Sequence, residues 1–515
     1  MLQIKNLTIT HLKDLRVLLR DFSFTLNSGD KAVIIGEEGN GKSTLLKLIY
    51  QSELVTDYAE FTGEILKKGM KLGYLAQELS KEQKDRSIWE FCSEKSEFYD
   101  LTPKELSNIA TQLGLEPGMF YSDQKVGTLS GGEKVKLQLA GILMTKPDVL
   151  LLDEPSNDLD IETLEWLEKF MNSCALPILF VSHDETLIEN TANVVIHIEQ
   201  VRRKTLSRYT VARMPYREYV EERLSSLTKQ EQLARKERSE YEKQQEKFLQ
   251  IQAKVEHRQN AISRGDPHGG KMLKRKMKAV KSMGRRFEKE HENLTQIPDV
   301  EDAMIIRFEE SVCIPNGKTV LDFQLAKLTV GDQLLSENIA LTVTGPEKVC
   351  IIGKNGAGKT TLLKKIAEIL LERTDLKTAY MPQDYEDLLD LSKTPPEFLS
   401  ETGDKEEITK IRTFLGSMKY TPDEMEHAIA ELSGGQKAKL LFLKMIFNGC
   451  NVLILDEPTR NFSPLSNPVI RDVLKSYRGA IISVSHDRKY IREVCGKVYR
   501  LTEKGLDAIY CGKDV

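Results

Sequence analysis

Two glycine-rich segments of the chain have residue types that suit them to binding phosphate groups. They read GEEGNGKST from Gly36 and GKNGAGKTT from Gly353, and both fit the pattern GxxxxGK[ST]. In this pattern the glycines let backbone N–H groups approach phosphates, the lysine bridges the outer phosphates, and the hydroxyl group ligates Mg²⁺. A glycine turn without a ligand is the structural alternative for either copy alone. The predicted phosphate-binding residues are Gly36, Gly39, Gly41, Lys42, Ser43 and Thr44 in the first copy and Gly353, Asn355, Gly356, Gly358, Lys359, Thr360 and Thr361 in the second.

Paired carboxylates follow two short apolar runs, VLLLDE and VLILDE. Asp153 and Asp456 end these runs, so each is expected at the carboxyl mouth of a buried parallel strand, where it can complete a magnesium shell with the hydroxyl of the glycine-rich loop. An aspartate that only caps a turn is the alternative. The adjacent Glu154 and Glu457 are suitably placed to polarise an attacking water.

Two glutamines and two histidines complete the polar residues of the two copies. Gln77 lies in YLAQE and Gln383 in YMPQD, while His183 and His486 lie in two copies of VSHD. These side chains can orient water, metal or γ-phosphate. A lone histidine at a strand end is more often structural, but each histidine here follows the strand-end glutamate by 29 residues, which favours a catalytic role. The predicted catalytic residues are Glu154, Glu457, His183 and His486, and the predicted metal ligands are Ser43, Gln77, Asp153, Thr360, Gln383 and Asp456.

The segments LSGGE and LSGGQ each lie far along the chain from the glycine-rich loop of their own copy. Each is a polar, glycine-containing start to a helix, which makes it a natural site for the anionic γ-phosphate. An ordinary helix N-cap is the alternative. The residues concerned are Ser130, Gly131 and Gly132 in the first copy and Ser433, Gly434 and Gly435 in the second.

All these motifs recur in the same order, with the two glycine-rich loops 317 residues apart. Short apolar runs that alternate with helical patterns indicate parallel sheets covered by helices, so we predict an α/β fold with two nucleotide-type domains. Between them, helix-compatible sequence runs from Tyr216 to about Ala261 and from Met272 to about Leu294, and SRGDPHGG between the two is expected to stop a helix. The predicted domains are residues 1–214, a helical hairpin linker at 215–299, and residues 300–515.

The linker has a basic excess that the whole chain does not show. Residues 217–297 contain 20 Lys and Arg against 13 Asp and Glu, although the net charge of the chain is −4. A basic end on a long arm suggests contact with the phosphate backbone of a nucleic acid, while a solvated charged face is the alternative. The predicted RNA-binding residues at this tip are Lys254, Arg258, Arg264, Lys271, Lys274, Arg275, Lys276, Lys278, Lys281, Arg285 and Arg286.

Composition excludes several classes of protein. A chain of 515 residues is too long for one compact core. No apolar run approaches the roughly 20 residues that span a bilayer, and the first residues lack the features of a signal peptide. The seven cysteines have no zinc or redox spacing, so we expect buried thiols in a reducing, cytoplasmic compartment.

The motifs together resemble the ATP-binding-cassette superfamily, whose Walker A, Q-loop, LSGG signature, Walker B and H-switch are present in both halves. The resemblance implies ATP and Mg²⁺ as cofactors and two cassettes that face each other head to tail. Each ATP would then lie between the lysine of one half and the signature of the other, which pairs Lys42 with Ser433 and Lys359 with Ser130. We expect a monomer in which the two cassettes of one chain pair with each other.

The layout of two cassettes, no membrane domain and a basic hairpin further resembles the ABC-F family. Its members bind ribosomes in the ATP form and insert the linker near the P-site tRNA and the peptidyl-transferase centre. The partners implied are the 70S ribosome, 23S rRNA and P-site tRNA, with no membrane partner and no DNA. The long linker, no inserted arm in the first cassette and the string EPTRNFSPLSNP from Glu457 to Pro468 resemble the antibiotic-resistance, target-protection subgroup.

Two departures from the superfamily pattern fall in one of the predicted sites. The first glycine loop has Glu37 and Glu38 where the second has Lys354 and Asn355, which places carboxylates beside phosphates. After Walker B the first half reads SNDLD and the second reads TRNFS. Because this D-loop faces the opposite nucleotide, both departures affect the site of Lys42, and the two sites are expected to be unequal. Neither half has a clear aromatic residue for stacking on adenine, and only Arg16 offers a cation–π contact.

Three other functions compete with ribosome protection. The nearest is a housekeeping translation factor with the same mechanics and no role against drugs. An ATPase subunit of a separate exporter and a DNA-maintenance ATPase are more distant alternatives. Association with ribosomes, membranes or DNA distinguishes these classes.

Overall fold

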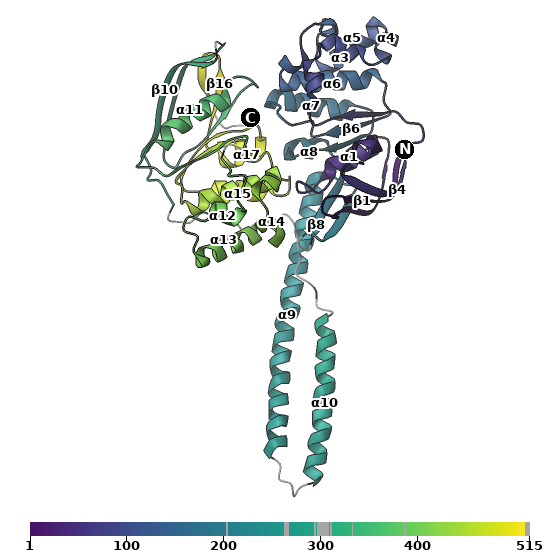
Figure 1. Ribbon diagram of the computed structural model, residues 1–515, viewed down its shortest axis with the longest axis vertical. Coiled ribbons are helices and arrows are strands. Elements are labelled where there is room, and N and C mark those ends of the chain that lie inside the picture. Colours follow the sequence, from purple (N-terminus) through teal and green to yellow (C-terminus); the bar gives the residue numbers. More distant parts are fainter. Residues whose placement is uncertain are drawn as a thin grey trace. The chain divides into compact units, whose positions relative to one another are not determined.

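The computed structural model describes residues 1–201, 204–261, 267–292, 295, 308, 312–331, 333–385 and 388–509. It contains two compact units. One comprises Met1–Tyr216 and Glu301–Val515, and the other is Arg217–Val300. Figure 1 labels the elements of both.

The first repeat is built on a six-stranded sheet of order β5-β6-β7-β3-β8-β9. All neighbours are parallel except β8 and β9. Strands β3, β6, β7 and β8 are buried at every residue, as expected for parallel strands covered on both faces. The strand bounds are β3 Lys31–Ile35, β5 Leu72–Leu75, β6 Val149–Asp153, β7 Ile178–Val181, β8 Val194–Val201 and β9 Leu206–Ala212.

An antiparallel sheet of order β2-β1-β4 and the helices α1 to α8 complete the described part of the first repeat. Leu7 and Phe22, which face each other across β1 and β2, share one core with Ile34 of β3 and Leu45 of α1. The strands are β1 Leu2–His11, β2 Val17–Leu26 and β4 Ala59–Leu66. The helices are α1 Lys42–Tyr50, α2 Lys81–Asp85, α3 Ile88–Ser93, α4 Glu97–Asp100, α5 Pro103–Leu113, α6 Gly131–Met144, α7 Ile161–Ser173 and α8 Glu185–Thr191.

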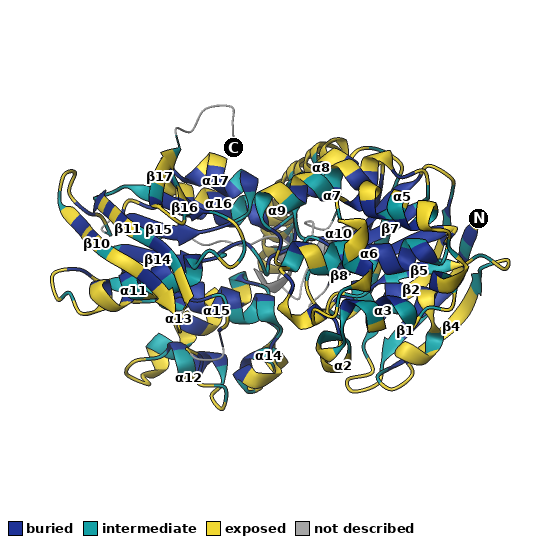
Figure 2. Ribbon diagram, turned by 90° about the horizontal axis from the view of Figure 1, so that it is seen from above, coloured by how far each residue is buried: buried dark blue, intermediate teal, exposed yellow. Residues whose placement is uncertain are grey.

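The second repeat has the same sheet topology, with the order β13-β14-β15-β12-β16-β17. Figure 2 shows its buried strands and the buried strands of the first repeat in dark blue. The strands are β10 Thr319–Val330, β11 Gln333–Thr344, β12 Lys348–Ile352, β13 Thr378–Met381, β14 Val452–Asp456, β15 Ala480–Val484, β16 Lys497–Thr502 and β17 Gly505–Ile509. The helices are α11 Lys359–Leu371, α12 Pro395–Leu399, α13 Lys405–Ser417, α14 Pro422–Glu426, α15 Gly434–Phe447, α16 Asn467–Ser476 and α17 Arg488–Val494. The predicted α/β fold with two tandem nucleotide-type domains is confirmed.

The second unit contains two long helices, α9 Tyr216–Ala261 and α10 Pro267–Glu292, which lie side by side in Figure 1. At 1.5 Å per residue, the 46 residues of α9 extend for roughly 70 Å. Val255 and Val280 are buried, and a Cβ atom at Gly284 would lie 3.3 Å from the ring of Phe248, so small and apolar side chains hold the pair together. The two predicted helices are present.

The predicted start of the second linker helix at Met272 is wrong, because α10 begins at Pro267. Proline is well tolerated at the first position of a helix, where its missing N–H would have no helical acceptor. Gly269 and Gly270 therefore lie inside the helix rather than before it. The glycines lower helix propensity but do not prevent a helix whose other residues favour it.

The cysteines and the membrane-spanning helices are two further points on which the sequence made a prediction. Cys92, Cys174, Cys350, Cys450 and Cys495 are buried thiols, but Cys313 is exposed, and Cys511 lies outside the described residues. Within the described ranges, no helix is both long enough and apolar enough to cross a bilayer. The boundaries at 214/215 and 299/300 stay predictions.

Candidate nucleotide-binding sites

The two glycine-rich loops have closely similar conformations. The Nζ of Lys42 donates hydrogen bonds of 2.9 Å to the carbonyl oxygens of Gly36 and Glu37, and Lys359 makes the equivalent bonds to Gly353 and Lys354. Gly36 has a φ of 148°, and a Cβ atom there would lie 2.2 Å from the carbonyl oxygen of Ile198. Only glycine fits this position, so the loop holds its lysine ready for an anion.

The Walker B aspartates lie beside the loop hydroxyls, as predicted. Ser43 Oγ donates a hydrogen bond of 2.8 Å to Asp153 Oδ1, and the hydroxyl of Tyr74 donates one of 3.2 Å to Oδ2. In the second repeat both carboxylate oxygens of Asp456 are buried without a hydrogen-bond partner among the described residues. Burial raises the pKa of both aspartates. Buried carboxylate oxygens beside a hydroxyl fit a hard cation such as Mg²⁺.

Each glutamate predicted to be catalytic lies close to the histidine of its own repeat. The backbone N–H of His183 donates to Glu154 Oε2 at 3.1 Å, and the ring Nε2 lies 3.1 Å from Glu154 Oε1. In the second repeat the corresponding distances between His486 and Glu457 are 3.2 and 3.8 Å. In each repeat the structure thus brings together a glutamate and a histidine that are 29 residues apart in the sequence.

Burial leaves these pairs without net charge near neutral pH. It raises the pKa of Glu154 and of Glu457 to about 8. It lowers the pKa of His183 to about 4 and that of His486 to about 3, to which the charges of Lys42 and Lys359 add. Near neutral pH each glutamate carboxyl group is therefore protonated, and each histidine ring is uncharged.

Both signature serines are helix N-caps. Ser130 caps α6 and Ser433 caps α15, and each forms a capping box with the residue three positions later, Glu133 or Gln436. The ordinary helix N-cap, which the sequence left open as the alternative, is therefore the local structure at both serines. Each serine begins a helix of 14 residues, and the N–H groups at the N-terminus of such a helix favour an anion.

The residues around Lys359 line a cavity of about 720 Å³, and both repeats contribute residues to its walls. Gly131 and Asp158 come from the first repeat, and Gln383 donates a hydrogen bond of 3.4 Å to Asp158 Oδ1. This is the pairing of a lysine with the opposite signature that the resemblance implied. The predicted residues that line this cavity are Gln77, Gly131, His183, Asn355, Gly356, Gly358, Lys359, Thr360, Thr361, Gln383, Asp456, Glu457 and His486.

The residues around Lys42 line a smaller cavity of about 430 Å³. Arg460 and Asn461 contribute from the second repeat, but the described lining does not include Ser433, Gly434 or Gly435. Arg16, the candidate for adenine, lines this cavity and donates a hydrogen bond of 3.1 Å to the carbonyl of Gly39. The predicted residues that line it are Gly39, Gly41, Lys42, Ser43, Thr44, Gln77, Glu154 and His183.

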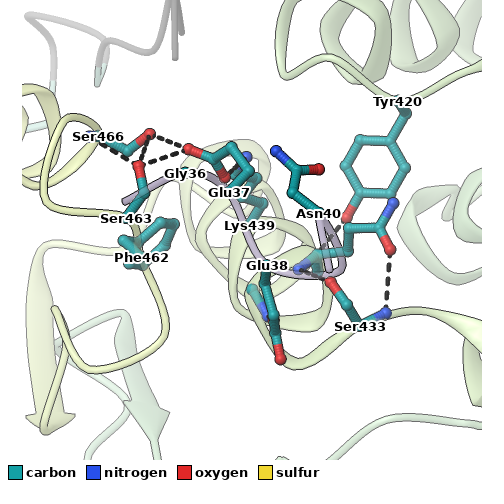
Figure 3. A network of polar contacts seen from close by, with 12 residues as sticks. Gly36, Glu37, Glu38, Asn40, Tyr420, Ser433, Lys439, Phe462, Ser463 and Ser466 are labelled. Atoms are coloured by element: carbon teal, nitrogen blue, oxygen red, sulfur yellow. Dashed lines mark hydrogen bonds and ion pairs between the residues drawn. The ribbon is translucent and has the colours of Figure 1, made fainter. Parts of the chain in front are cut away.

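The unusual glutamates of the first loop are bound to the second repeat. Glu37 Oε1 accepts hydrogen bonds from the hydroxyls of Ser463, at 2.7 Å, and Ser466, while Oε2 lies 3.2 Å from Lys439 Nζ (Figure 3). Glu37 is partly buried, which disfavours its charge, but the charge of Lys439 and the serine hydroxyls hold its pKa at about 2. The carboxylate is therefore ionised, and an ionised group that is largely removed from water needs these partners.

The two departures from the superfamily pattern are thus partners of each other. In the Lys359 site the acids are on the D-loop: Asp160 Oδ2 accepts from the N–H of Asn355 at 3.3 Å, and Asp158 pairs with Arg460 at 2.9 Å. In the Lys42 site the acids are on the glycine loop, and the facing D-loop supplies the hydroxyl of Ser463. The expected inequality of the sites stays a prediction, but the altered residues compensate each other.

The structure adds residues that sequence reasoning missed. Tyr74 contacts Asp153, and Tyr380 is half-buried near Asp456, whose charge adds to the effect of burial in raising the Tyr380 pKa to about 12. The repeat itself held the signal, because each tyrosine precedes the Q-loop glutamine by three residues. Ser466 and Lys439 had no such signal, since their partner lies about 400 residues away.

The basic residues of the linker that the structure describes are exposed. Between Lys271 and Arg286 they form a basic face along α10, and RNA binding by these residues stays a prediction. Arg264 and the side chain of Arg258 lie outside the described residues. The exposed residues are Lys254 on α9 and Lys271, Lys274, Arg275, Lys276, Lys278, Lys281, Arg285 and Arg286 on α10.

Comparison with known proteins places the chain in a family. The family described as "ABC transporter" matches residues 19–157 and 336–460, which together make up about half of the chain. The archaeal ribosome recycling factor aABCE1, solved with the ribosomal stalk protein aP1, matches with a TM-score of 0.59 at 16% identity, over 98% of this chain and 90% of that one. At that identity the match shows a shared fold.

Curated relatives match along almost the whole length. ABC transporter F family member 5 of Arabidopsis thaliana is 26% identical over 95% of this chain and 73% of its own length. The ribosome protection protein VmlR of Bacillus subtilis (strain 168) is 29% identical over 96% of this chain and 85% of its own. The chain therefore belongs to the ABC transporter family, in which it is a tandem ATP hydrolase of the F type.

Proposed function

We propose that this ATPase binds the ribosome in its ATP-bound form and uses the hairpin linker to protect translation from antibiotics. The nucleotide chemistry is assigned to the two sites described above. Lys42 and Lys359 bind the outer phosphates of ATP, the signature helices α6 and α15 approach the γ-phosphate from the opposite repeat, and closure of the two repeats accompanies ATP binding.

Within each site, one glutamate acts on water. The negative charge of ATP favours the protonated imidazole, so the carboxyl proton of Glu154 moves to His183 and that of Glu457 to His486, and each glutamate carboxylate then accepts a proton from the attacking water. Ser43 with Asp153, and Thr360 with Asp456, are the groups that fit Mg²⁺; Gln77 lines the same cavity as Ser43, and Gln383 lines the same cavity as Thr360 and Asp456. Mg²⁺, when bound, neutralises charge on the β- and γ-phosphates.

The basic face of α10 carries the proposal of ribosome binding. Eight lysine and arginine side chains are exposed between Lys271 and Arg286, and no acidic residue lies between them in the sequence. At 1.5 Å per residue, this face extends for about 22 Å, a length suited to several consecutive phosphates of an RNA backbone. The names of two similar proteins, the ribosome protection protein VmlR and the ribosome recycling factor aABCE1, support the same partner.

Protection is the more specific part of the proposal. The relative VmlR supports it by its name, and the helix α9 of the hairpin extends for roughly 70 Å. The partners proposed are 23S rRNA and P-site tRNA near the peptidyl-transferase centre, in the cytoplasm. Lincosamides, streptogramin A and pleuromutilins, which act at the peptidyl-transferase centre, are the drugs that test this part of the proposal.

The test separates attachment from protection. Deleting residues 263–270 shortens the hairpin at its turn but keeps the basic face from Lys271 onward. We expect the shortened protein to pellet with ribosomes in the presence of ATP while it no longer rescues in vitro translation from the three drug classes. The intact protein is the control in both assays.

Full rescue by the shortened protein would contradict a role for the turn in protection. Rescue by neither protein, together with ATP-dependent pelleting by both, would instead favour the housekeeping translation factor. That function uses the same cassettes and the same basic face and differs only in its effect on drugs.

A further inference from the structure

The carboxylate of Glu38 lies where a γ-phosphate is expected in the Lys42 site. Glu38 Oε2 accepts a hydrogen bond from the backbone N–H of Gly435, in the signature segment of the second repeat. A Cβ atom at Gly434 would lie 3.3 and 3.5 Å from the two carboxylate oxygens. An acid of the first repeat is thus bound at the N-terminus of α15 (Figure 3).

The same carboxylate also lines the Lys42 cavity. Glu38 borders it together with Lys42, Ser43, Glu154 and His183. It therefore lies between the phosphate-binding loop and the signature segment, within the group of residues that hydrolysis requires. This position explains why Ser433, Gly434 and Gly435 are not in the described lining of that cavity.

The second repeat shows what stands at this position in the other site. There Asn355 takes the place of Glu38 in the loop, and its amide group donates to the carbonyl of Asp158, so no acid of the loop approaches Gly131 of the signature. Gly131 then lines the Lys359 cavity directly. The signature N–H groups of that site are available to a phosphate, whereas the N–H of Gly435 already has an anionic acceptor.

We propose that Glu38 substitutes for a γ-phosphate in the Lys42 site, so that this site closes on a nucleoside diphosphate as well as on a triphosphate. A γ-phosphate must compete with the Glu38 carboxylate for the N–H of Gly435. A diphosphate leaves that contact in place, while Lys42 and the loop N–H groups hold its β-phosphate. The inference rests on the assignment of the Lys42 cavity as a nucleotide site.

Glu37 makes this arrangement rigid. Its bonds to Ser463, Ser466 and Lys439 hold the residue next to Glu38 against the second repeat. Because adjacent residues of one tight loop move together, the Glu38 carboxylate is held near Gly435. In the Lys42 site both loop glutamates therefore contact the second repeat without a γ-phosphate, and the Lys359 site is the one that distinguishes ATP from ADP.

The experiment compares nucleotide preference in the two sites of the full-length chain. Lys359→Ala confines binding to the Lys42 site, and Lys42→Ala confines it to the Lys359 site. Each protein is titrated with fluorescent ADP and with a fluorescent β,γ-imido analogue of ATP, which is not hydrolysed. We expect the two dissociation constants to agree within about threefold at the Lys42 site, and the ATP analogue to bind at least about tenfold more tightly at the Lys359 site.

Glu38→Asn in the Lys359→Ala background installs the residue of the second loop. It is expected to raise the preference for the ATP analogue at least about tenfold, because the N–H of Gly435 is freed for the γ-phosphate. Glu64→Gln removes an exposed acid on β4 as a matched charge control and should leave the preference unchanged. An unchanged preference in Glu38→Asn would overturn the inference. Failure of the Lys359→Ala protein to bind either nucleotide would overturn the assignment of the Lys42 cavity itself.

Discussion

His183 and Phe462 lie in different repeats, and the ring Nδ1 of His183 is 2.8 Å from the carbonyl oxygen of Phe462. A carbonyl only accepts, so Nδ1 carries the proton, and the neutral ring presents the lone pair of Nε2 to Glu154 at 3.1 Å. The ring of His183 in the first repeat is therefore oriented by the D-loop of the second, which couples closure of the repeats to the position of this ring beside Glu154.

The buried glutamates predict how stability depends on pH. The pKa of Glu154 and of Glu457 is about 8 in the folded protein, above the usual 4.5, so the folded chain retains protons that the unfolded chain releases. Their contribution to stability is present below pH 4.5 and is lost as the pH rises towards 8. Below pH 6.5 this loss is offset, because the pKa of His183 and of His486 is lowered to about 4 and about 3 in the folded protein and stability from these groups rises with pH until 6.5, so we expect the melting temperature of the nucleotide-free protein to fall between pH 6.5 and 8. The double variant Glu154→Gln with Glu457→Gln cannot ionise at these positions and should show a flatter profile; an equally steep fall in that variant would contradict the assignment.

The inequality of the two sites predicts unequal effects of single variants. Glu457→Gln disables the site of Lys359, in which both repeats line one cavity. It should reduce steady-state ATP turnover more than Glu154→Gln does, because Glu38 impedes the γ-phosphate in the Lys42 site. Single-turnover measurements on both variants show whether coupling between the sites hides the difference. A larger loss in Glu154→Gln would reverse the assignment of the better-formed site.

A buried ion pair across the interface between the two repeats predicts a large contribution to stability. Arg471 donates to Glu185 of the first repeat at 2.7 Å, and only 3% of Arg471 and 9% of Glu185 are exposed. Arg471→Ala should lower the free energy of unfolding by about 3–5 kcal/mol, because it leaves a buried carboxylate beside one remaining cation, Lys489. Arg412→Ala removes a cation from an exposed pair with Glu426 and should cost at most about 1 kcal/mol. Equal melting temperatures for the two variants would show that the buried pair adds nothing to the joint.

The basic face predicts the salt dependence of ribosome binding. Changing Lys274, Arg275, Lys276 and Lys278 to Ala removes four positive charges that can neutralise phosphates. The slope of log affinity against log salt concentration should decrease in magnitude by about one unit for each phosphate that is no longer neutralised, because fewer counterions are released. The control is Arg217→Ala with Arg235→Ala, since both arginines pair with glutamates of their own helix at i+4 or i−4. If both proteins give the same slope, the face does not contact phosphate.

The sequence predicted those parts of the fold that depend on local pattern. Buried strands such as β6 and β14 are continuous apolar runs, and the loop at Gly36 has a glycine where only glycine fits, so composition and spacing were sufficient. The same reasoning missed the start of α10, because Pro267 is compatible both with a turn and with the first residue of a helix.

What the sequence did not predict is how the two repeats contact each other. Glu37 and Glu38 were recognised as departures near phosphates, but their partners Ser463 and Gly435 lie about 400 residues further along the chain. A single sequence carries no local signal for such contacts, which depend on the packing of complete domains. In the structure the two departures are related, because the acids on the first glycine loop bind the D-loop and the signature segment of the second repeat.

Ribosome pelleting of the double variant Glu154→Gln with Glu457→Gln tests the central claim most directly. This protein keeps Lys42, Lys359 and both signature segments, so it should bind ATP and remain closed because water is no longer activated. In the presence of ATP we expect it to sediment with 70S ribosomes and to stay in the supernatant when ADP replaces ATP at both sites, since the Lys359 site requires a γ-phosphate. A double variant that remains free of ribosomes with ATP bound would contradict an ATP-dependent ribosome-binding ATPase.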